Sequence, residues 1–364
     1  MNSKLITIII PVRNEQDYIE NCLDSINNFE IPINYKYEIL IIDGKSSDKT
    51  LEKVLNYKNK NKLKNINIYN NENITQAFAL NLGIKKANGS RILRLDAHCT
   101  YPKNYLALLI ETSERTNAEN IGGIIITKPG AKNYSAQLVQ AITSHSFGVG
   151  NSGFRIGIKE GKVDTVPFGF FKKELFEKIG LFDTRLLRAQ DYEFNRRITK
   201  NGYNVWLNPA INAIYYNQKS IIQFYIKQFF KEAPYNAYMW YLAPYTFAVR
   251  HMITLFFSLG FLGGLMLSPI SLIIKYIFYS VMLLYTLLAF FSAAQQSIKY
   301  KKITHFFILP ISFFLYHFIH GLGVIIGLLK LIFRKAPVQN IHEPWEAYGE
   351  FRVKIKNKNI YQNE

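Results

Sequence analysis

Apolar residues gather in the last third of the chain in three long runs. Residues 252–274, 276–298 and 303–329 contain no Asp, Glu, Lys or Arg, although three histidines lie in the third run. A membrane-spanning helix needs about 20 mostly apolar residues, whereas a helix of a soluble core alternates apolar with polar positions. The pattern predicts about three transmembrane helices in residues 246–333.

Basic residues flank these runs. Three lysines separate the second run from the third: Lys299, Lys301 and Lys302. The tail at residues 334–364 is also basic. Lys and Arg favour the cytoplasmic side of a membrane, and three simple crossings would place the lysines inside but the tail outside. One run can therefore be re-entrant or interfacial, with a break at Pro269 or Pro310, and the number of crossings stays open.

Residues 218–245, which precede the apolar runs, have the spacing of an amphipathic helix. Polar side chains recur every three or four residues and share one face: Ser220, Gln223, Lys227 and Lys231. The other side carries an apolar set: Ile222, Tyr225, Ile226, Phe229 and Phe230. We expect this helix to lie in the membrane interface with its lysines toward lipid head groups. A helix packed on a globular domain is the alternative.

Residues 1–217 alternate between strand-like and helix-like patterns. The expected strands are residues 5–10, 37–42, 66–69, 91–95 and 121–127, and the expected helices are 15–28, 48–57, 75–87 and 103–116. Such alternation predicts an α/β domain with a mostly parallel sheet, whose ligands bind beyond the carboxyl ends of the strands. Residues 130–164 fit no regular element.

Composition narrows the class of protein. Hydrophobic residues make up 49% of the 364 positions and only two are cysteine, which excludes a disordered chain, a disulfide scaffold and a Cys-rich zinc module. Lys and Arg number 44 against 26 Asp and Glu, so the net charge is +18. Such a charge favours nucleic acid, an anionic membrane or an anionic small substrate as partner. Because the apolar runs are long and the strand ends are acidic, we expect membrane lipids and no nucleic acid.

Acidic side chains follow the expected strands. Asp43 and Asp48 flank the turn after the second strand, and Asp96 and His98 follow the fourth. Clustered carboxylates repel one another unless a cation or a polyhydroxy ligand binds among them. In an extended segment Asp96 and His98 share a face, so both can bind one divalent ion, Mg²⁺ or Mn²⁺, although a capped loop has the same pattern. Asp43, directly at a strand end, is the candidate for binding a base or ribose.

Asp191 is the candidate general base. It lies in the segment Ala-Gln-Asp-Tyr-Glu at residues 189–193, after a helix expected at residues 174–179. A general base takes the proton from an attacking hydroxyl group. An acid that interacts with the dipole at a helix N-terminus has the same sequence pattern, and spacing alone does not separate the two.

The N-terminal 240 residues or so resemble the family 2 glycosyltransferases with a GT-A fold. Four segments match the motifs of that family in order: residues 8–15, 41–50, 93–102 and 166–193. The resemblance extends to succinoglycan-type exopolysaccharide glycosyltransferases with C-terminal membrane helices, through residues 95–98, 148–151 and 190–191. It implies a Rossmann-like GT-A domain, then an interfacial helix and α-helical transmembrane segments.

The resemblance also implies roles for single residues. Four residues match positions that hold the base and ribose of a nucleotide: Pro11, Arg13, Glu15 and Asp43. Asp96 and His98 match the metal-binding Asp-x-Asp motif, which connects the ion to the diphosphate of the sugar donor. Asp191 matches the catalytic base of an enzyme that inverts the anomeric centre in a single in-line displacement.

The chain departs from the family pattern at three places. His98 stands where Asp is usual, and Gln190 stands where Glu is common. Processive synthases carry Gln-x-x-Arg-Trp, where this chain has Gln-Phe-Phe-Lys-Glu at residues 228–232. Lys231 keeps the positive charge of the arginine but not its planar fork, and Glu232 removes the aromatic sugar platform. The motif therefore favours transfer of a single sugar, and Lys231 is a candidate contact of the diphosphate.

The expected function is that of a metal-dependent, membrane-bound, inverting glycosyltransferase in polysaccharide biosynthesis. It moves one sugar from a nucleotide-diphosphate sugar, in the first place a UDP-sugar, to a lipid-linked or growing glycan. A polyprenyl-phosphate sugar transferase and a non-catalytic scaffold that binds nucleotide sugars are the alternatives.

The chain then divides into a GT-A domain (1–217), an interfacial helix region (218–245), transmembrane segments (246–333) and a basic tail (334–364). The first residues do not match a signal peptide, so we expect a cytoplasmic catalytic domain on a multi-pass protein of the inner membrane. Other glycan-assembly proteins are expected partners.

Overall fold

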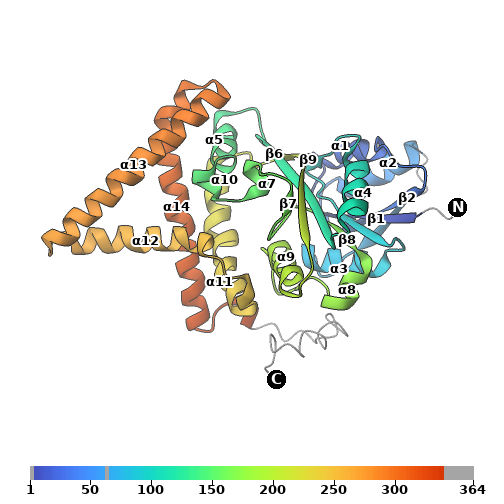
Figure 1. The fold of residues 1–364 in the computed structure, drawn as a ribbon. Helices are drawn as coiled ribbons and strands as arrows, with labels where there is room; N and C mark the ends of the chain where they lie inside the picture. Colours follow the sequence, from blue (N-terminus) through green and yellow to red (C-terminus); the bar gives the residue numbers. More distant parts are fainter. Residues whose placement is uncertain (1–3, 62–64, 340–364) are drawn as a thin grey trace. The chain divides into compact units, whose positions relative to one another are not determined.

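The computed structural model describes residues 4–61 and 65–339, which form two compact units (Figure 1). Unit 1 contains the described residues up to 126 together with 157–215. Unit 2 contains residues 127–156 and the described residues from 216 onward. Each unit is thus built from two separate stretches of chain. The greater part of the tail expected at residues 334–364 lies outside the described residues.

Unit 1 is an α/β domain. Its strands are β1 (Lys4–Val12), β2 (Tyr35–Asp43), β3 (Ile66–Asn70), β4 (Arg91–Arg94), β5 (Cys99–Thr100), β6 (Asn120–Lys128), β7 (Gly161–Lys162), β8 (Phe170–Lys172) and β9 (Val205–Tyr216). Its helices are α1 (Ile19–Asn27), α2 (Thr50–Lys60), α3 (Gln76–Lys86), α4 (Tyr105–Thr116), α8 (Lys173–Ile179) and α9 (Gln190–Lys200). The nine strands and helices expected before residue 128 are all present, with ends that differ by a few residues.

The described strands form one mixed sheet in the order β3-β2-β1-β4-β8-β6-β9-β5, with β7 paired to β9. The pairs β3–β2, β2–β1 and β1–β4 are parallel, as the alternation of strands and helices predicts, and the pairs made by β8 with β4 and β6 are antiparallel. Strand β1 lies between β2 and β4, and its residues 6–10 are fully buried because helices cover both faces. The expected α/β fold class is confirmed.

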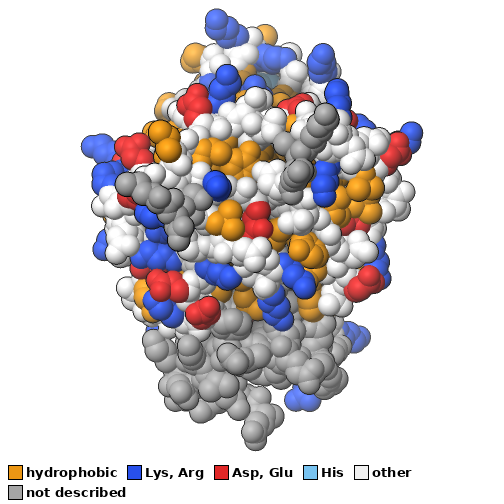
Figure 2. Space-filling view, turned by 90° about the vertical axis from the view of Figure 1, so that its right-hand side faces the viewer, with side chains coloured by type: hydrophobic (Ala, Val, Ile, Leu, Met, Phe, Trp, Pro, Cys, Tyr) orange, Lys and Arg blue, Asp and Glu red, His pale blue; other side chains and the backbone are white. Residues whose placement is uncertain are grey.

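Charged side chains are spread over the surface. On the face in Figure 2, Lys and Arg side chains lie among Asp and Glu and do not gather in one patch. The excess of basic residues that gives the net charge of +18 therefore does not form a single basic patch on this face.

Unit 2 is helical. Its α-helices are α5 (Tyr134–Thr143), α6 (Ser146–Val149), α7 (Gly153–Ile156), α10 (Ile221–Lys227), α11 (Ala233–Leu242), α12 (Val249–Leu267), α13 (Leu272–Tyr300) and α14 (Ile303–Ile332). A π-helical turn, η1 (Gln228–Glu232), joins α10 to α11, and two short 3₁₀ turns are η2 (Pro244–Thr246) and η3 (Pro337–Gln339). Residues 130–164, for which the sequence predicts no regular element, contain α5, α6 and α7.

Three helices of unit 2 are long and apolar enough to cross a membrane: α12, α13 and α14. Helix α12 ends and α13 begins on either side of residues 268–271, which include Pro269, one of the two expected breaks. Lys275 lies inside α13. Pro310 was the other expected break, and this expectation is wrong, because α14 continues through it without interruption. Buried Leu309 and Phe313 hold the helix in place on either side of the proline.

Candidate active site

The candidate site lies where the parallel strands of unit 1 end. Strand β1 pairs with β2 up to Val12 and Asp43, and it pairs with β4 at Ile9 and Arg94. The carboxyl ends of neighbouring parallel strands meet at one edge of a sheet, which is the usual place for ligands in such folds. The segments that follow β1, β2 and β4 are therefore brought together.

Asp43, the last residue of β2, is buried and its carboxylate is held by the next turn. It accepts hydrogen bonds from the backbone N–H of Ser46 at 3.1 Å and from the Ser46 hydroxyl at 2.6 Å. A Cβ atom on Gly44 would lie 2.6 Å from the carbonyl oxygen of Ile74, so only glycine fits between Asp43 and the turn. The structure thus fixes the orientation of the Asp43 carboxylate.

The loop after β1 is tied to the loop after β2. Asn14 has a left-handed backbone (φ 56°), and its side-chain oxygen accepts a hydrogen bond from the backbone N–H of Ser47 at 2.8 Å. The backbone N–H of Glu15 donates to the Thr50 hydroxyl at 2.7 Å. Asp48 accepts hydrogen bonds from Thr50 and Gln16, which gives it a structural place at the start of α2.

The two remaining residues of the predicted nucleotide set lie at the same strand end. Pro11 pairs with Ile42 in the β1–β2 ladder, so its backbone position is fixed. Arg13 follows β1 and is exposed. Both lie next to the loop that carries Glu15.

Asp96 and His98 are separated by a turn, which differs from the extended segment that the sequence predicts. The backbone N–H of Cys99 donates to the carbonyl oxygen of Asp96 at 3.3 Å and closes the turn. The backbone N–H of Asp96 donates to the Tyr101 hydroxyl at 2.9 Å. The short strand β5 begins at Cys99, and the chain must reverse before it.

His98 contacts Glu15 across the strand ends. The Nδ1 atom of His98 lies 3.0 Å from Oε1 of Glu15, and the imidazole ring packs edge-on against Tyr215 with 5.1 Å between ring centroids. A histidine that binds a metal usually donates its other ring N–H to a carboxylate in this way. In a metal-bound state, this pairing would make Nε2 of His98 the ligating nitrogen.

The side chains of Asp96 and His98 are of types that bind divalent ions. Asp96 offers carboxylate oxygens and His98 an oriented imidazole, and ions such as Mg²⁺ or Mn²⁺ accept both with water and phosphate oxygens as further ligands. Within residues 4–61 and 65–339 no group of three His, Cys, Asp or Glu side chains is placed to hold a metal by itself. Phosphate oxygens of the substrate and water would supply further ligands.

Arg94, which the sequence analysis overlooked, lies between two of the predicted residues. Its side chain is 6% exposed; Nη2 is 3.2 Å from Oδ1 of Asp96, and Nη1 is 3.6 Å from Oδ2 of Asp191. Among the described residues, nothing accepts a hydrogen bond from Nε or Nη1 of Arg94. We call Asp96, Arg94 and Asp191 the Arg94 triad. An arginine at the end of a strand, two residues before Asp96, was the signal that could have revealed it.

Burial lowers the pKa of Arg94, but the charges of Asp96 and Asp191 outweigh burial and raise the pKa above its ordinary value. The guanidinium therefore stays charged at every physiological pH. It holds a permanent positive charge between Asp96 and Asp191.

Asp191 lies in the first turn of α9, and its side chain is 43% exposed. Ala189, just before the helix, has a left-handed backbone (φ 63°) that turns the chain into α9. Oδ1 of Asp191 accepts the backbone N–H of Tyr192 at 2.8 Å. A second link joins this turn to Asp96, because Gln190 donates to Gln76 at 2.6 Å and Gln76 donates to Asp96 at 3.3 Å.

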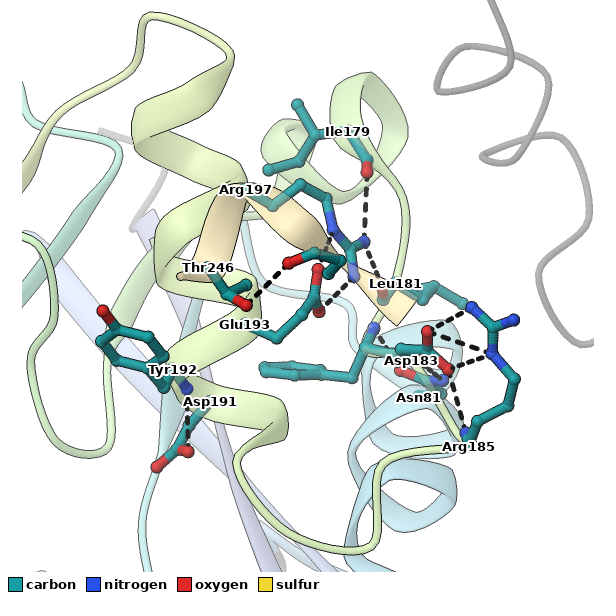
Figure 3. Close-up of polar contacts among 12 residues, drawn as sticks. Asn81, Ile179, Leu181, Asp183, Arg185, Asp191, Tyr192, Glu193, Arg197 and Thr246 are labelled. Carbon is teal, nitrogen blue, oxygen red and sulfur yellow. Dashed lines mark hydrogen bonds and ion pairs between the residues drawn. The ribbon is translucent and has the colours of Figure 1, made fainter. Parts of the chain in front are cut away.

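The start of α9 is anchored by a buried ion pair (Figure 3). Nε of Arg197 donates to Oε1 of Glu193 at 2.8 Å, and both side chains are almost fully buried. Nη1 of Arg197 donates to the carbonyl oxygens of Ile179 and Leu181 at 3.3 and 2.6 Å. We call Glu193 and Arg197 the anchor pair. It fixes the segment before α9 and so the backbone that carries Asp191.

Lys231 belongs to unit 2, whereas the other predicted site residues belong to unit 1. It is exposed and belongs to the π-helical turn η1. Its contact with a diphosphate stays a prediction. The residues that the structure does bring together are Glu15 with His98, and Asp96 with Asp191.

Comparisons with known proteins point to one family. The profile of glycosyl transferase family 2 matches residues 7–180. A dolichyl N-acetyl-α-D-glucosaminyl phosphate 3-β-D-2,3-diacetamido-2,3-dideoxy-β-D-glucuronosyltransferase of Methanococcus voltae is 33% identical over 332 residues, which cover 89% of this chain and 97% of the relative. The succinoglycan biosynthesis protein ExoA of Rhizobium meliloti is 24% identical over 61% of this chain and 66% of that protein.

Comparison with a solved structure supports the fold. The mannosyltransferase PcManGT from Pyrobaculum calidifontis, solved with GDP-Man and Mn²⁺, superposes with a TM-score of 0.54 at 17% identity, over 91% of this chain and 87% of that one. The predicted resemblance, the fold class and the assignment as a glycosyltransferase are confirmed. The chain belongs to glycosyl transferase family 2.

Proposed function

We propose that this glycosyltransferase inverts the anomeric centre while it moves one sugar from a UDP-sugar to a sugar already linked to a polyprenyl-type lipid phosphate. The Methanococcus voltae relative, by its name, acts on a dolichyl-linked N-acetylglucosaminyl phosphate, and the similarity extends over nearly its whole length. The three apolar helices of unit 2 support a lipid-linked acceptor, because enzyme and acceptor would then share a membrane. The sugar transferred stays open.

The observation that carries the proposal is the Arg94 triad. Asp96, which we assign to the metal and diphosphate, and Asp191, which we assign to the acceptor, contact the same guanidinium at 3.2 and 3.6 Å. In an in-line displacement the leaving group and the nucleophile approach one carbon from opposite sides. The triad holds the groups for both within the span of one side chain.

Asp191 is the proposed base. Its carboxylate takes the proton of the acceptor hydroxyl while that oxygen bonds to the anomeric carbon. The bond between this carbon and the donor phosphate oxygen breaks in the same step, and the nucleoside diphosphate leaves with the electron pair. Asp191 later releases the proton to water. Its partial exposure gives a bulky acceptor access to the carboxylate.

The strand ends of β1 and β2 are the proposed nucleotide site. Asp43, fixed by Ser46, would accept hydrogen bonds from the ribose or base, and Pro11, Arg13 and Glu15 would line the same edge. Asp96 and His98 would hold Mg²⁺ or Mn²⁺, which neutralises the charge of the leaving diphosphate. We assign the catalytic part to residues 1–217, on the cytoplasmic side of a cell membrane.

The test presents the full-length protein, in detergent or vesicles, with a panel of nucleotide sugars, a polyprenyl-phosphate-linked amino sugar, and Mg²⁺ or Mn²⁺. We expect release of UDP and a lengthened lipid-linked glycan. Asp191→Asn should lower kcat by about 10²–10⁴-fold, because general-base catalysis contributes that much. Glu52→Gln, on the exposed face of α2, is the matched control and should leave the rate unchanged. Equal rates for Asp191→Asn and the wild type would refute the assignment of the base.

A further inference from the structure

The π-containing helix of unit 2 carries an exposed apolar stripe. Ile222, Ile226 and Phe230 are spaced four residues apart on α10 and η1, and they are 66%, 52% and 66% exposed. Residues at this spacing lie one above another on a helix. Lys227 and Lys231 lie beside the stripe, an arrangement that fits the apolar interior and anionic head groups of a lipid monolayer.

Helix α14 runs alongside this segment. The Tyr225 hydroxyl donates to the carbonyl oxygen of Ser312 at 3.0 Å. A Cβ atom at Gly323 would lie 2.7 Å from the carbonyl oxygen of Phe229, and one at Gly327 would lie 2.8 Å from that of Pro234. Successive residues of the segment 225–234 contact successive residues of α14, from Ser312 to Gly327. These contacts extend over about 22 Å of α14 at ~1.5 Å per residue. The glycines allow the two backbones to approach closely.

Because η1 runs alongside α14, its charged side chains lie beside the middle of α14. Lys227 and Glu232 form an ion pair at 3.2 Å. Glu232 lies close enough to Tyr316 and His320 to interact with both electrostatically. If α14 (Ile303–Ile332) crossed the bilayer, residues near 317 would lie at its centre and the ion pair would lie in hydrocarbon. Charged side chains are costly there.

Helices α12 and α13 are different. Thr254 and Ser258 contact α14 through hydrogen bonds to His320 and to the carbonyl oxygen of Phe318, after which α12 leaves α14 (Figure 1). The turn between α12 and α13 is surrounded by exposed apolar side chains: Met266, Ile270, Leu272 and Ile273. Residues 252–274 carry no charge, and α12 is about 28 Å long at ~1.5 Å per residue, close to the thickness of a hydrocarbon core.

The geometry points to two kinds of membrane helix: α12 and α13 enter the bilayer as a hairpin, whereas α14 lies along the membrane surface beside α10 and η1. The lipid monolayer is the partner of the exposed stripe on α10 and η1 and of a second stripe on α14, formed by Ile303, Phe307 and Ile311. This inference does not depend on the reaction proposed above.

This arrangement resolves the topology that the sequence left open. Two crossings return the chain to the side from which it entered. The basic residues at both ends of α14 then lie on one side: Lys299, Lys301, Lys302, Lys330, Arg334 and Lys335. Lys and Arg favour the cytoplasmic side, so the placement agrees with the charge rule.

Cysteine labelling tests the sidedness. The native Cys22 and Cys99 are buried, and burial raises the pKa of both thiols, so they react slowly and give a low background. Lys301→Cys and Lys335→Cys exchange two exposed lysines at opposite ends of α14. In sealed inside-out vesicles both should react with a membrane-impermeant maleimide. Reaction of Lys335→Cys only after detergent is added, with Lys301→Cys reactive before, would overturn the proposal.

Depth measurements test the orientation of α14 directly. Nitroxide labels at Phe307→Cys, Leu315→Cys and Leu329→Cys, in lipid vesicles, should report one shallow depth. A crossing helix would place the label at position 315 about 12 Å deeper than the label at 307, at ~1.5 Å per residue. Such a depth profile would contradict a surface helix, even if the variants keep full transferase activity. Ile270→Cys, in the hairpin turn, should resist the impermeant maleimide in the same inside-out vesicles, and ready reaction there would contradict insertion of the hairpin.

Discussion

The Arg94 triad and the anchor pair both join a buried arginine to carboxylates in unit 1, but they differ in how completely the charge is matched. In the anchor pair, Arg197 donates to Glu193 and to two carbonyl oxygens, and both side chains are buried. In the triad, Arg94 is buried, yet among described residues its Nε and Nη1 atoms lack a hydrogen-bond acceptor, and Asp191 is partly exposed.

The difference separates a structural ion pair from a reactive one. A buried charge with every donor matched has no further ligand to bind, so it can only hold its surroundings in place. A buried charge with unmatched donors, next to an accessible carboxylate, marks a place where a ligand changes the electrostatic balance. The same residue types thus serve stability at one site and chemistry at the other. The following predictions test this contrast.

Arg197→Met should have the largest effect on stability. It leaves the Glu193 carboxylate buried without a cation, and breaking a buried pair costs about 3–5 kcal/mol of the free energy of unfolding. The rate at which Cys22 and Cys99 become reactive on heating reports the unfolding of unit 1. The double variant Glu193→Met/Arg197→Met should recover much of the loss. A single variant as stable as the wild type would show that the anchor pair does not anchor α9.

Arg94 should matter more for the rate than for the fold. Arg94→Met removes the charge that orients Asp96 and Asp191, and loss of such an electrostatic group lowers kcat on the order of 10²-fold. Arg94→Lys keeps the charge without the planar fork and should lie between Arg94→Met and the wild type. The measurement is kcat and KM for the nucleotide sugar, with thiol reactivity as the check on folding. Unchanged kcat in a folded Arg94→Met protein would class the triad with structural pairs.

Acid should weaken unit 1 through the buried Asp183, which lies next to the anchor pair in Figure 3. Burial alone raises the pKa of Asp183, but the charge and hydrogen bonds of Arg185 outweigh burial and hold the pKa below its ordinary value. The stabilisation is therefore present above the ordinary pKa of aspartate, and it is lost as the pH falls through the lower pKa of the folded state.

Asp183→Asn should make the stability of unit 1 less sensitive to acid. The test follows the thermal midpoint of the circular dichroism signal from pH 6 down to about pH 2, a range that extends below the ordinary pKa of aspartate. The variant should start less stable and lose less with falling pH than the wild type. An equally steep fall in both proteins would assign the acid sensitivity to other carboxylates.

His98→Asp should have the smallest effect. It restores the usual carboxylate of the metal motif, and carboxylates suit Mg²⁺ whereas imidazole suits transition metals. The ratio of rates with Mn²⁺ and Mg²⁺ should fall a few-fold. An unchanged ratio would argue against His98 as a ligand and would leave its contact with Glu15 as a structural one.

The sequence predicted the parallel part of the sheet well, because strands such as β1 carry a continuous buried apolar stretch (residues 6–10) that is visible in the local sequence. It predicted α5 poorly. The buried residues of α5 (Leu138, Val139 and Ile142) pack against Phe224, Leu309 and Phe313, which lie far along the chain, so these contacts cannot be inferred from the local sequence. The turn at Asp96 was also missed, since its shape follows from the pairing of β5 with β9.

Prolines show the same limit. Pro269 and Pro310 have the same local reason to end a helix, but only Pro269 does so. Pro310 lies in a helix held on both sides by buried residues, and Ser312 donates a hydrogen bond back to Ile308 within it. Arg94 could have been noticed as an arginine at a strand end, two residues before Asp96. Its position between Asp96 and Asp191, however, depends on the placement of α9, about a hundred residues later.

The separation of unit 2 into two stretches has a consequence for synthesis of the protein. A ribosome completes residues 127–156 long before it reaches α14, which supplies the partners of α5. The apolar face of α5 must therefore wait, exposed or guarded by a chaperone, until roughly 170 more residues have been made, and exposed apolar surface invites aggregation. For the same reason, removal of the C-terminal helices from residue 218 onward would leave α5 without its partners, and we expect such a shortened chain to be poorly soluble.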